Sequence, residues 1–168
     1  MLGDVPDFTL TERHGAPLTE RDLRGKVWVA NFVFTRCVEI CPVLTQRMGE
    51  LQRTLAKTAP GAVTLVSISV DPTFDTPEVL RGYADAHAAA PGWLFATGTR
   101  DDTAHLLRDG FHVAFADDGP PTGPITHSDR FVLVDGAMRI RGYYHGSDPE
   151  DLDRLAADAA HLARDPTG

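Results

Sequence analysis

The chain contains two cysteines, Cys37 and Cys41, which are four residues apart. Residues four apart on a helix are neighbours with Cβ atoms roughly 5–6 Å apart, and a disulfide needs Cα atoms about 4.4–6.8 Å apart. The pair could therefore close a disulfide, or both sulfurs could bind one metal ion. It could also be inert, either as two buried thiols that pack like small apolar side chains or as a structural disulfide.

The elements that flank the pair predict where it lies. Residues 27–34 form a nearly continuous apolar run, rich in β-branched and aromatic side chains, which is typical of a strand buried on both faces. After the cysteines, Pro42 suits the first position of a helix. Apolar residues then recur at helical spacing, at Leu44, Met48, Leu51 and Leu55. The pair is thus expected between a buried strand and a helix N-terminus.

This position favours reactive thiols. Unpaired N–H groups and the positive end of the helix dipole stabilise a thiolate near Cys41. Arg36 adds a cation next to Cys37, which also favours the thiolate, whereas the apolar neighbours Val38 and Ile40 favour the neutral thiol. Sites in α/β proteins gather at the carboxyl ends of strands, so we expect the pair to be functional.

A metal site needs a further ligand, and His127 is the best candidate among the seven histidines. It follows a Pro- and Gly-rich loop at 117–124 and comes just before a predicted strand at 130–134. Two thiolates and one imidazole suit Cu(I) better than structural zinc, which usually takes four ligands. Asp71 is a candidate for a supporting group beside the site, and equally for a turn carboxylate before Pro72.

The remaining pattern predicts one domain over residues 1–168, since this length fits a single domain. Strands are expected at 7–10, 63–70, 93–96, 130–134 and 138–144, with Asp135 and Gly136 as a hairpin turn. Helices are expected to begin near Thr76, Thr99 and Ser147. The order predicts an α/β fold, with a central mixed sheet flanked by helices and an N-terminal strand or hairpin extension.

Composition excludes several classes of protein. Hydrophobic residues make up 42% and charged residues 24% of the chain, which excludes wholesale disorder. The net charge of −8 argues against a nucleic-acid partner, which would need a basic patch. No stretch approaches the roughly 18 apolar residues of a spanning helix.

Four stretches together resemble the Sco/SenC family. Residues 34–42 match its Cys-x-x-x-Cys-Pro motif, and residues 69–77 match its segment after the second core strand. Residues 126–135 match its histidine-strand segment, and residues 141–144 match its closing strand. Their order and separation agree over nearly the whole chain. The first motif differs in one respect, because many members carry Pro where this chain has Val38.

The resemblance implies a thioredoxin-like fold and a copper site made of Cys37, Cys41 and His127, for Cu(I), Cu(II) or both. It implies a metallochaperone that delivers copper to the copper-site subunit of cytochrome c oxidase. It also allows an enzyme-like role, in which the same thiols reduce the disulfide of that oxidase site. Other copper carriers or thioredoxin-like reductants would be further partners.

Family members usually face the periplasm or the mitochondrial intermembrane space on an N-terminal membrane helix. We therefore expect an extracytoplasmic protein, in the bacterial periplasm or at the outer face of the inner membrane, whose only membrane contact is an anchor not included in this sequence. Three alternatives remain open: a thiol–disulfide oxidoreductase without metal, a thiol peroxidase, and a binding module with an inert disulfide.

Overall fold

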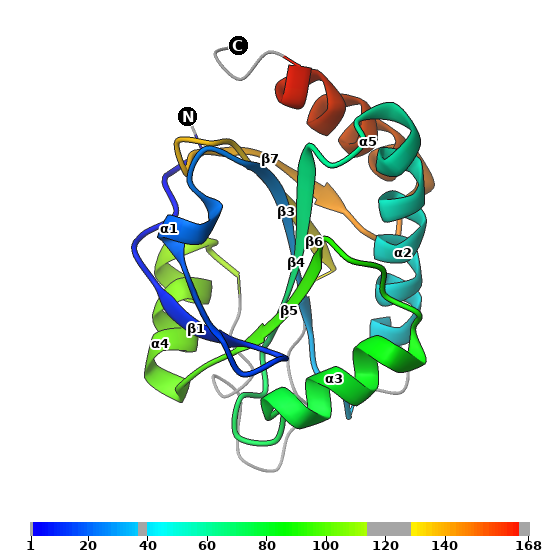
Figure 1. Ribbon diagram of the computed structural model, residues 1–168. Coiled ribbons are helices and arrows are strands. Elements are labelled where there is room, and N and C mark those ends of the chain that lie inside the picture. Colours follow the sequence, from blue (N-terminus) through cyan, green and yellow to red (C-terminus); the bar gives the residue numbers. More distant parts are fainter. Residues whose placement is uncertain (1, 37–39, 114–128, 165–168) are drawn as a thin grey trace.

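The structure is a computed structural model that describes residues 2–36, 40–113 and 129–164, and it is built around a seven-stranded mixed sheet (Figure 1). The sheet order is β2-β1-β5-β4-β3-β6-β7. Its strands are β1 (Thr9–Glu12), β2 (Pro17–Thr19), β3 (Val27–Val33), β4 (Val63–Ser69), β5 (Trp93–Thr97), β6 (Arg130–Val134) and β7 (Ile140–His145). The helices are α1 (Glu20–Leu23), α2 (Ile40–Thr58), α3 (Pro77–Ala86), α4 (Arg100–His105), the π-helix η1 (Leu106–Gly110) and α5 (Pro149–Arg164).

The sheet is parallel at its centre and antiparallel at both sides. Strands β3, β4 and β5 run parallel to one another. Strands β6 and β7 add antiparallel strands next to β3, while the β1–β2 hairpin adds them next to β5. The predicted α/β class, mixed sheet and N-terminal hairpin extension are therefore confirmed.

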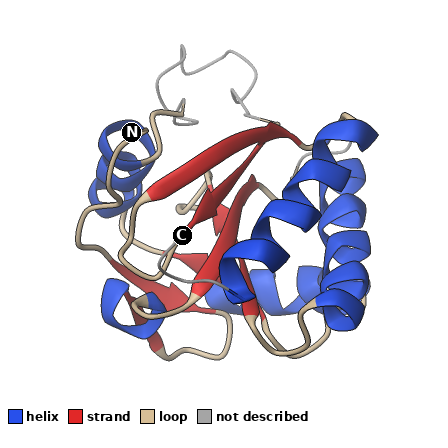
Figure 2. Ribbon diagram, turned by 90° about the horizontal axis from the view of Figure 1, so that it is seen from above, coloured by secondary structure: helices blue, strands red, loops and turns tan. Residues whose placement is uncertain are grey.

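Helices cover both faces of the sheet. In Figure 1, α2, α3 and α5 lie on one side, with α1 and α4 on the other, and Figure 2 shows the same two layers from above. All seven residues of β3 are buried, and successive side chains alternate between the two faces. Trp28, Ala30 and Phe32 pack on the side of α1 and η1, whereas Val27 and Val29 pack on the side of α2 and α5. None of the described helices combines the length and apolar character needed to span a bilayer.

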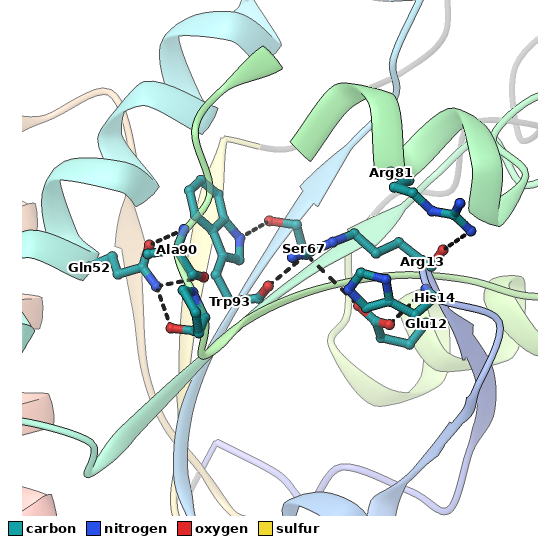
Figure 3. Close-up of polar contacts among 9 residues, drawn as sticks. Glu12, Arg13, His14, Gln52, Ser67, Arg81, Ala90 and Trp93 are labelled. Atoms are coloured by element: carbon teal, nitrogen blue, oxygen red, sulfur yellow. Dashed lines mark hydrogen bonds and ion pairs between the residues drawn. The ribbon is translucent and has the colours of Figure 1, made fainter. Parts of the chain in front are cut away.

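The N-terminal hairpin is fixed to the sheet by polar contacts at its turn (Figure 3). Arg13 Nη1 donates to the Trp93 carbonyl (2.8 Å), and the Arg13 N–H donates to the Phe95 carbonyl (2.9 Å). From α3, Arg81 donates to the Arg13 carbonyl (3.4 Å). The Trp93 indole in turn donates to Ser67 Oγ on β4 (2.9 Å), deep in the sheet. These contacts make the hairpin a continuation of the sheet.

Side-chain oxygens cap the N-termini of three helices, and for one of these helices the capping residue differs from the predicted one. Thr76 accepts a hydrogen bond from Val79 N–H (3.3 Å), and Thr99 accepts one from Asp102 N–H (3.1 Å), so both predicted caps are confirmed. The cap predicted at Ser147 is wrong. Asp148 accepts from the Glu150 N–H instead (3.0 Å), with a proline at the next position. The Ser147 hydroxyl is engaged elsewhere, by the Asp129 carboxylate (3.0 Å).

The prediction of a two-residue turn between β6 and β7 is also wrong. The turn is longer, because β7 begins at Ile140 rather than Met138. Asp135, which is only 2% exposed, accepts hydrogen bonds from the Ala137 and Arg139 N–H groups (2.9 and 3.0 Å). Its other oxygen accepts from Arg139 Nε and Arg141 Nη1 (both 3.0 Å). A carboxylate that organises the backbone in this way lengthens the turn. Burial alone would raise the pKa of Asp135, but these hydrogen bonds outweigh it and lower the pKa below its usual value.

We expect Asp135→Asn to lower the free energy of unfolding by about 2 kcal/mol at neutral pH, since hydrogen bonds to charged groups contribute about 1.5–3 kcal/mol. The folded-state pKa of Asp135 is lowered, so the stabilisation by its carboxylate is complete above the unfolded-state pKa. It is lost as the pH falls through the folded-state pKa. Urea unfolding at pH 7 and at acidic pH should therefore show a difference between the two proteins that shrinks on acidification. A difference that grows on acidification would contradict this account.

Candidate metal-binding and redox site

Three elements that flank the predicted site residues meet at one edge of the sheet. Strand β3 ends there at Val33, which pairs in parallel with Ser69, the last residue of β4. Strand β6 is antiparallel to β3, with Ala30 opposite Val132, so β6 begins at the edge where β3 ends. Helix α2 follows β3 along the chain and packs on the sheet through Leu44 and the apolar residues that follow it.

The predicted site residues are described to different extents. Cys37 and His127 lie outside the described residues. Cys41 lies near the start of α2, as predicted, but inside its first turn, because the helix begins at Ile40 rather than at Pro42; only the backbone of Cys41 is described. That turn itself carries no acidic residue, and Glu39 directly precedes it in the sequence. Asp71 is 7% exposed and lies in the loop after β4.

Asp71 is paired with Arg36, the residue immediately before Cys37. Arg36 Nε and Nη2 lie 2.9 and 2.7 Å from Asp71 Oδ2. The Arg36 guanidinium also lies over the Phe74 ring, 4.5 Å from its centroid. The positive charge of Arg36, next to Cys37 in the sequence, is therefore paired with the Asp71 carboxylate. This ion pair connects the loop after β4 to the segment before the cysteines.

A second carboxylate in the same loop, Asp75, is fully buried. It accepts hydrogen bonds from the Thr35 hydroxyl (2.5 Å), the Thr35 N–H (3.2 Å) and the Ser69 hydroxyl (2.7 Å). Ser69 Oγ in turn accepts from the Asp71 N–H (3.0 Å). Burial raises the pKa of Asp75, although the hydrogen bonds from Thr35 and Ser69 act in the opposite direction. This network joins the end of β3 to the end of β4.

The start of β6 is held on its other side by residues after β7. The Gly146 N–H donates to the Asp129 carbonyl (2.8 Å), and the Ser147 hydroxyl donates to its carboxylate (3.0 Å). His145 Nδ1 lies 3.3 Å from the same carboxylate. These contacts give Asp129 a structural role at the start of β6.

The two neighbouring tyrosines of β7 point to opposite faces of the sheet. The Tyr143 hydroxyl donates to the Phe111 carbonyl (3.1 Å), and its ring lies 5.1 Å from the Arg130 guanidinium. The Tyr144 hydroxyl donates to the Asp158 carboxylate on α5 (2.6 Å). Burial and Asp158 both raise the pKa of Tyr144. Tyr144 is thus a core residue, whereas Tyr143 holds the chain that leaves η1.

No role was predicted for Thr35, Ser69 or Asp75. Each stands in a stretch that was singled out by motif, and a usable signal was present: hydroxyl residues close to two adjacent strand ends, with an acidic residue in the following loop. What was missing was the pairing of Thr35 with Asp75, which are 40 positions apart.

The donor types of the predicted site suit a soft metal ion. Two thiolates and an imidazole fit copper, and the same thiols could instead form a disulfide. Within residues 2–36, 40–113 and 129–164, no group of three His, Cys, Asp or Glu side chains is placed to hold a metal.

The sequence model of the SCO1/SenC family matches residues 4–164. The chain belongs to the SCO1/SenC family. The predicted family resemblance is therefore confirmed over nearly the whole chain.

Solved structures of SCO1/SenC proteins are similar to this chain in both sequence and fold. A SCO1/SenC family lipoprotein from Bacillus anthracis is 33% identical, with a TM-score of 0.86 over 97% of this chain and 96% of that one. BsSco, a Sco-family cytochrome c oxidase assembly protein with a disulfide switch, is 27% identical, with a TM-score of 0.85 over 98% and 95% of the two chains. Yeast Sco1 with copper bound is 25% identical, with a TM-score of 0.75 over 92% and 87%. The thioredoxin-like fold is confirmed by these neighbours.

Proposed function

We propose that this SCO1/SenC chain is a copper metallochaperone that binds one copper ion through Cys37, Cys41 and His127. The copper would then pass to the copper-site subunit of cytochrome c oxidase by ligand exchange. Copper is bound in the solved structure of the related yeast Sco1, and BsSco is named as a cytochrome c oxidase assembly protein. Both names describe the relatives, and they support the same role here.

One observation carries this proposal: the described ends of β3, α2 and β6 meet at a single edge of the sheet. Cys37 follows the end of β3, Cys41 lies in the first turn of α2, and His127 comes three residues before β6. In the sequence, the three proposed donors therefore adjoin or belong to elements that converge. Asp71 supports the site indirectly, because it holds Arg36 next to Cys37.

We place this function outside the cytoplasm, in the periplasm or at the outer face of the inner membrane. The Bacillus anthracis relative is described as a lipoprotein, which fits a domain attached to a membrane through its N-terminus. Other copper carriers or thioredoxin-like reductants would load or reduce the site.

Copper titration of the reduced protein tests the proposal. We expect one copper per chain and, for Cu(II), a sulfur-to-copper charge-transfer band. Thiols must lose their protons to bind metal, so copper affinity should fall as the pH is lowered. Oxidation to the disulfide should abolish binding, and reduction should restore it. A reduced protein that binds no copper would overturn the proposal.

A second candidate is a thiol–disulfide oxidoreductase that reduces the cysteines of the oxidase copper site. The position of Cys41 in the first turn of α2, where the positive end of the helix dipole favours a thiolate, supports it. A low reduction potential without copper affinity would favour this candidate. Rapid consumption of hydrogen peroxide that depends on one cysteine would instead indicate a thiol peroxidase.

A further inference from the structure

The segment that leads from β3 to the first cysteine is held by side chains from another loop. Thr35 and Arg36 belong to neither a strand nor a helix. Asp75 accepts hydrogen bonds from both the N–H and the hydroxyl of Thr35. The Arg36 guanidinium is paired with the Asp71 carboxylate and lies over the Phe74 ring. These contacts restrain the two residues that directly precede Cys37 in the sequence.

Asp75 is the residue on which this arrangement depends. It is fully buried, and both of its carboxylate oxygens accept hydrogen bonds. One oxygen binds the Thr35 hydroxyl, and the other binds the Ser69 hydroxyl and the Thr35 N–H. Since Ser69 is the last residue of β4, the carboxylate joins the end of that strand to the residues that follow β3. Arg36, by contrast, is held at the surface, with 51% of its side chain exposed.

We infer that Asp75, acting through Thr35, is a positioning residue that sets the separation between Cys37 and Cys41. Cys41 is held independently, because α2 is packed on the sheet through Leu44 and Met48. Restraining the segment that precedes Cys37 raises the effective concentration of one thiol near the other. Such a restraint favours both copper binding and disulfide formation. The part of the inference that concerns copper binding rests on the proposed function.

Thr35 offers a matched pair of variants. Thr35→Val keeps the shape but removes the hydroxyl donor, and Thr35→Ser keeps the donor. We expect Thr35→Val to weaken Cu(I) binding by about tenfold, the lower end of the range for outer-shell partners of metal ligands. Its disulfide should also become about tenfold less favourable, which makes the reduction potential about 30 mV less negative. Thr35→Ser should keep the wild-type values, and Asp75→Asn should behave like Thr35→Val.

Competition with a chromophoric Cu(I) chelator measures the first quantity, and equilibration with glutathione buffers measures the second. Asp135→Asn is the control, because it alters an equally buried carboxylate at the opposite end of β3, near Trp28. It should lose stability but keep the wild-type copper affinity and potential. This comparison separates positioning from general destabilisation, and the Thr35 pair decides the matter if Asp75→Asn does not fold.

The two proposals fail in different ways. If the wild-type protein binds no copper, the proposed function is wrong, while the reduction potentials still test the inference. If Thr35→Val has the wild-type potential, or if Thr35→Ser shifts as far as Thr35→Val, the inference is overturned. An equal shift in Asp135→Asn would also overturn it, because the effect would then follow from lost stability alone.

Discussion

Cys37→Ser should abolish the copper site, lowering copper affinity by more than about 100-fold, since changes to outer-shell partners alone cost about 10–100-fold. A serine hydroxyl is a hard, protonated donor at neutral pH and replaces a soft thiolate poorly. The sulfur-to-copper charge-transfer band should weaken or disappear as well. Spectroscopic titration of the reduced variant with Cu(II), and chelator competition with Cu(I), measure the two effects.

A pair of histidine variants completes this test. His127→Ala should lose most of the copper affinity, whereas His161→Ala, at an exposed position on α5, should bind copper as the wild type does. Urea unfolding of both variants shows whether either change acts through stability. Loss of binding in Cys37→Ser with full binding in His127→Ala would contradict the three-ligand site.

Gly146→Ala should lower the free energy of unfolding by about 3 kcal/mol, at the upper end of the usual range for overpacking. A Cβ atom at Gly146 would lie 2.9 Å from both the Asp129 carbonyl oxygen and Leu44 Cδ2, and closer still to the Phe131 ring. Leu44 belongs to α2 and Asp129 leads into β6. A methyl group would therefore push apart two of the elements that converge on the site, and copper affinity should fall as well.

Gly82→Ala is the matched control. Gly82 lies inside α3, and a Cβ there would meet no atom within 4 Å. Replacing a helix-interior glycine by alanine in open space should raise stability by about 0.5–1 kcal/mol. Urea unfolding of both variants measures the contrast. A Gly146→Ala protein as stable as the wild type would show that α2 and β6 can separate at no cost.

The long elements could be predicted because burial leaves a strong pattern. The apolar run that begins at Val27 became β3, and the repeat from Leu44 to Leu55 became the buried face of α2. Helix α1 and the π-helix η1 were missed, and β2 was expected only as part of an N-terminal strand or hairpin without bounds, since three to five residues are too few to show a period. The turn after β6 was predicted too short, because the Asp135 side chain reshapes the backbone there.

The candidate site was predictable only in its donors. Two cysteines four apart between a strand and a helix predicted chemistry at that edge, and the start of α2 agrees with this placement. The contact between Thr35 and Asp75 depends on the parallel register of β3 and β4, which no local pattern contains. Arg36 was likewise predicted only as a cation beside Cys37, whereas the fold also pairs it with Asp71.

X-ray absorption spectroscopy at the copper edge tests the central proposal most directly. The reduced protein loaded with one equivalent of Cu(I) should show two sulfur scatterers and one nitrogen scatterer, from Cys37, Cys41 and His127. The nitrogen contribution should be lost in His127→Ala. A copper ion surrounded by nitrogen and oxygen alone, or by a single sulfur, would contradict the proposed site.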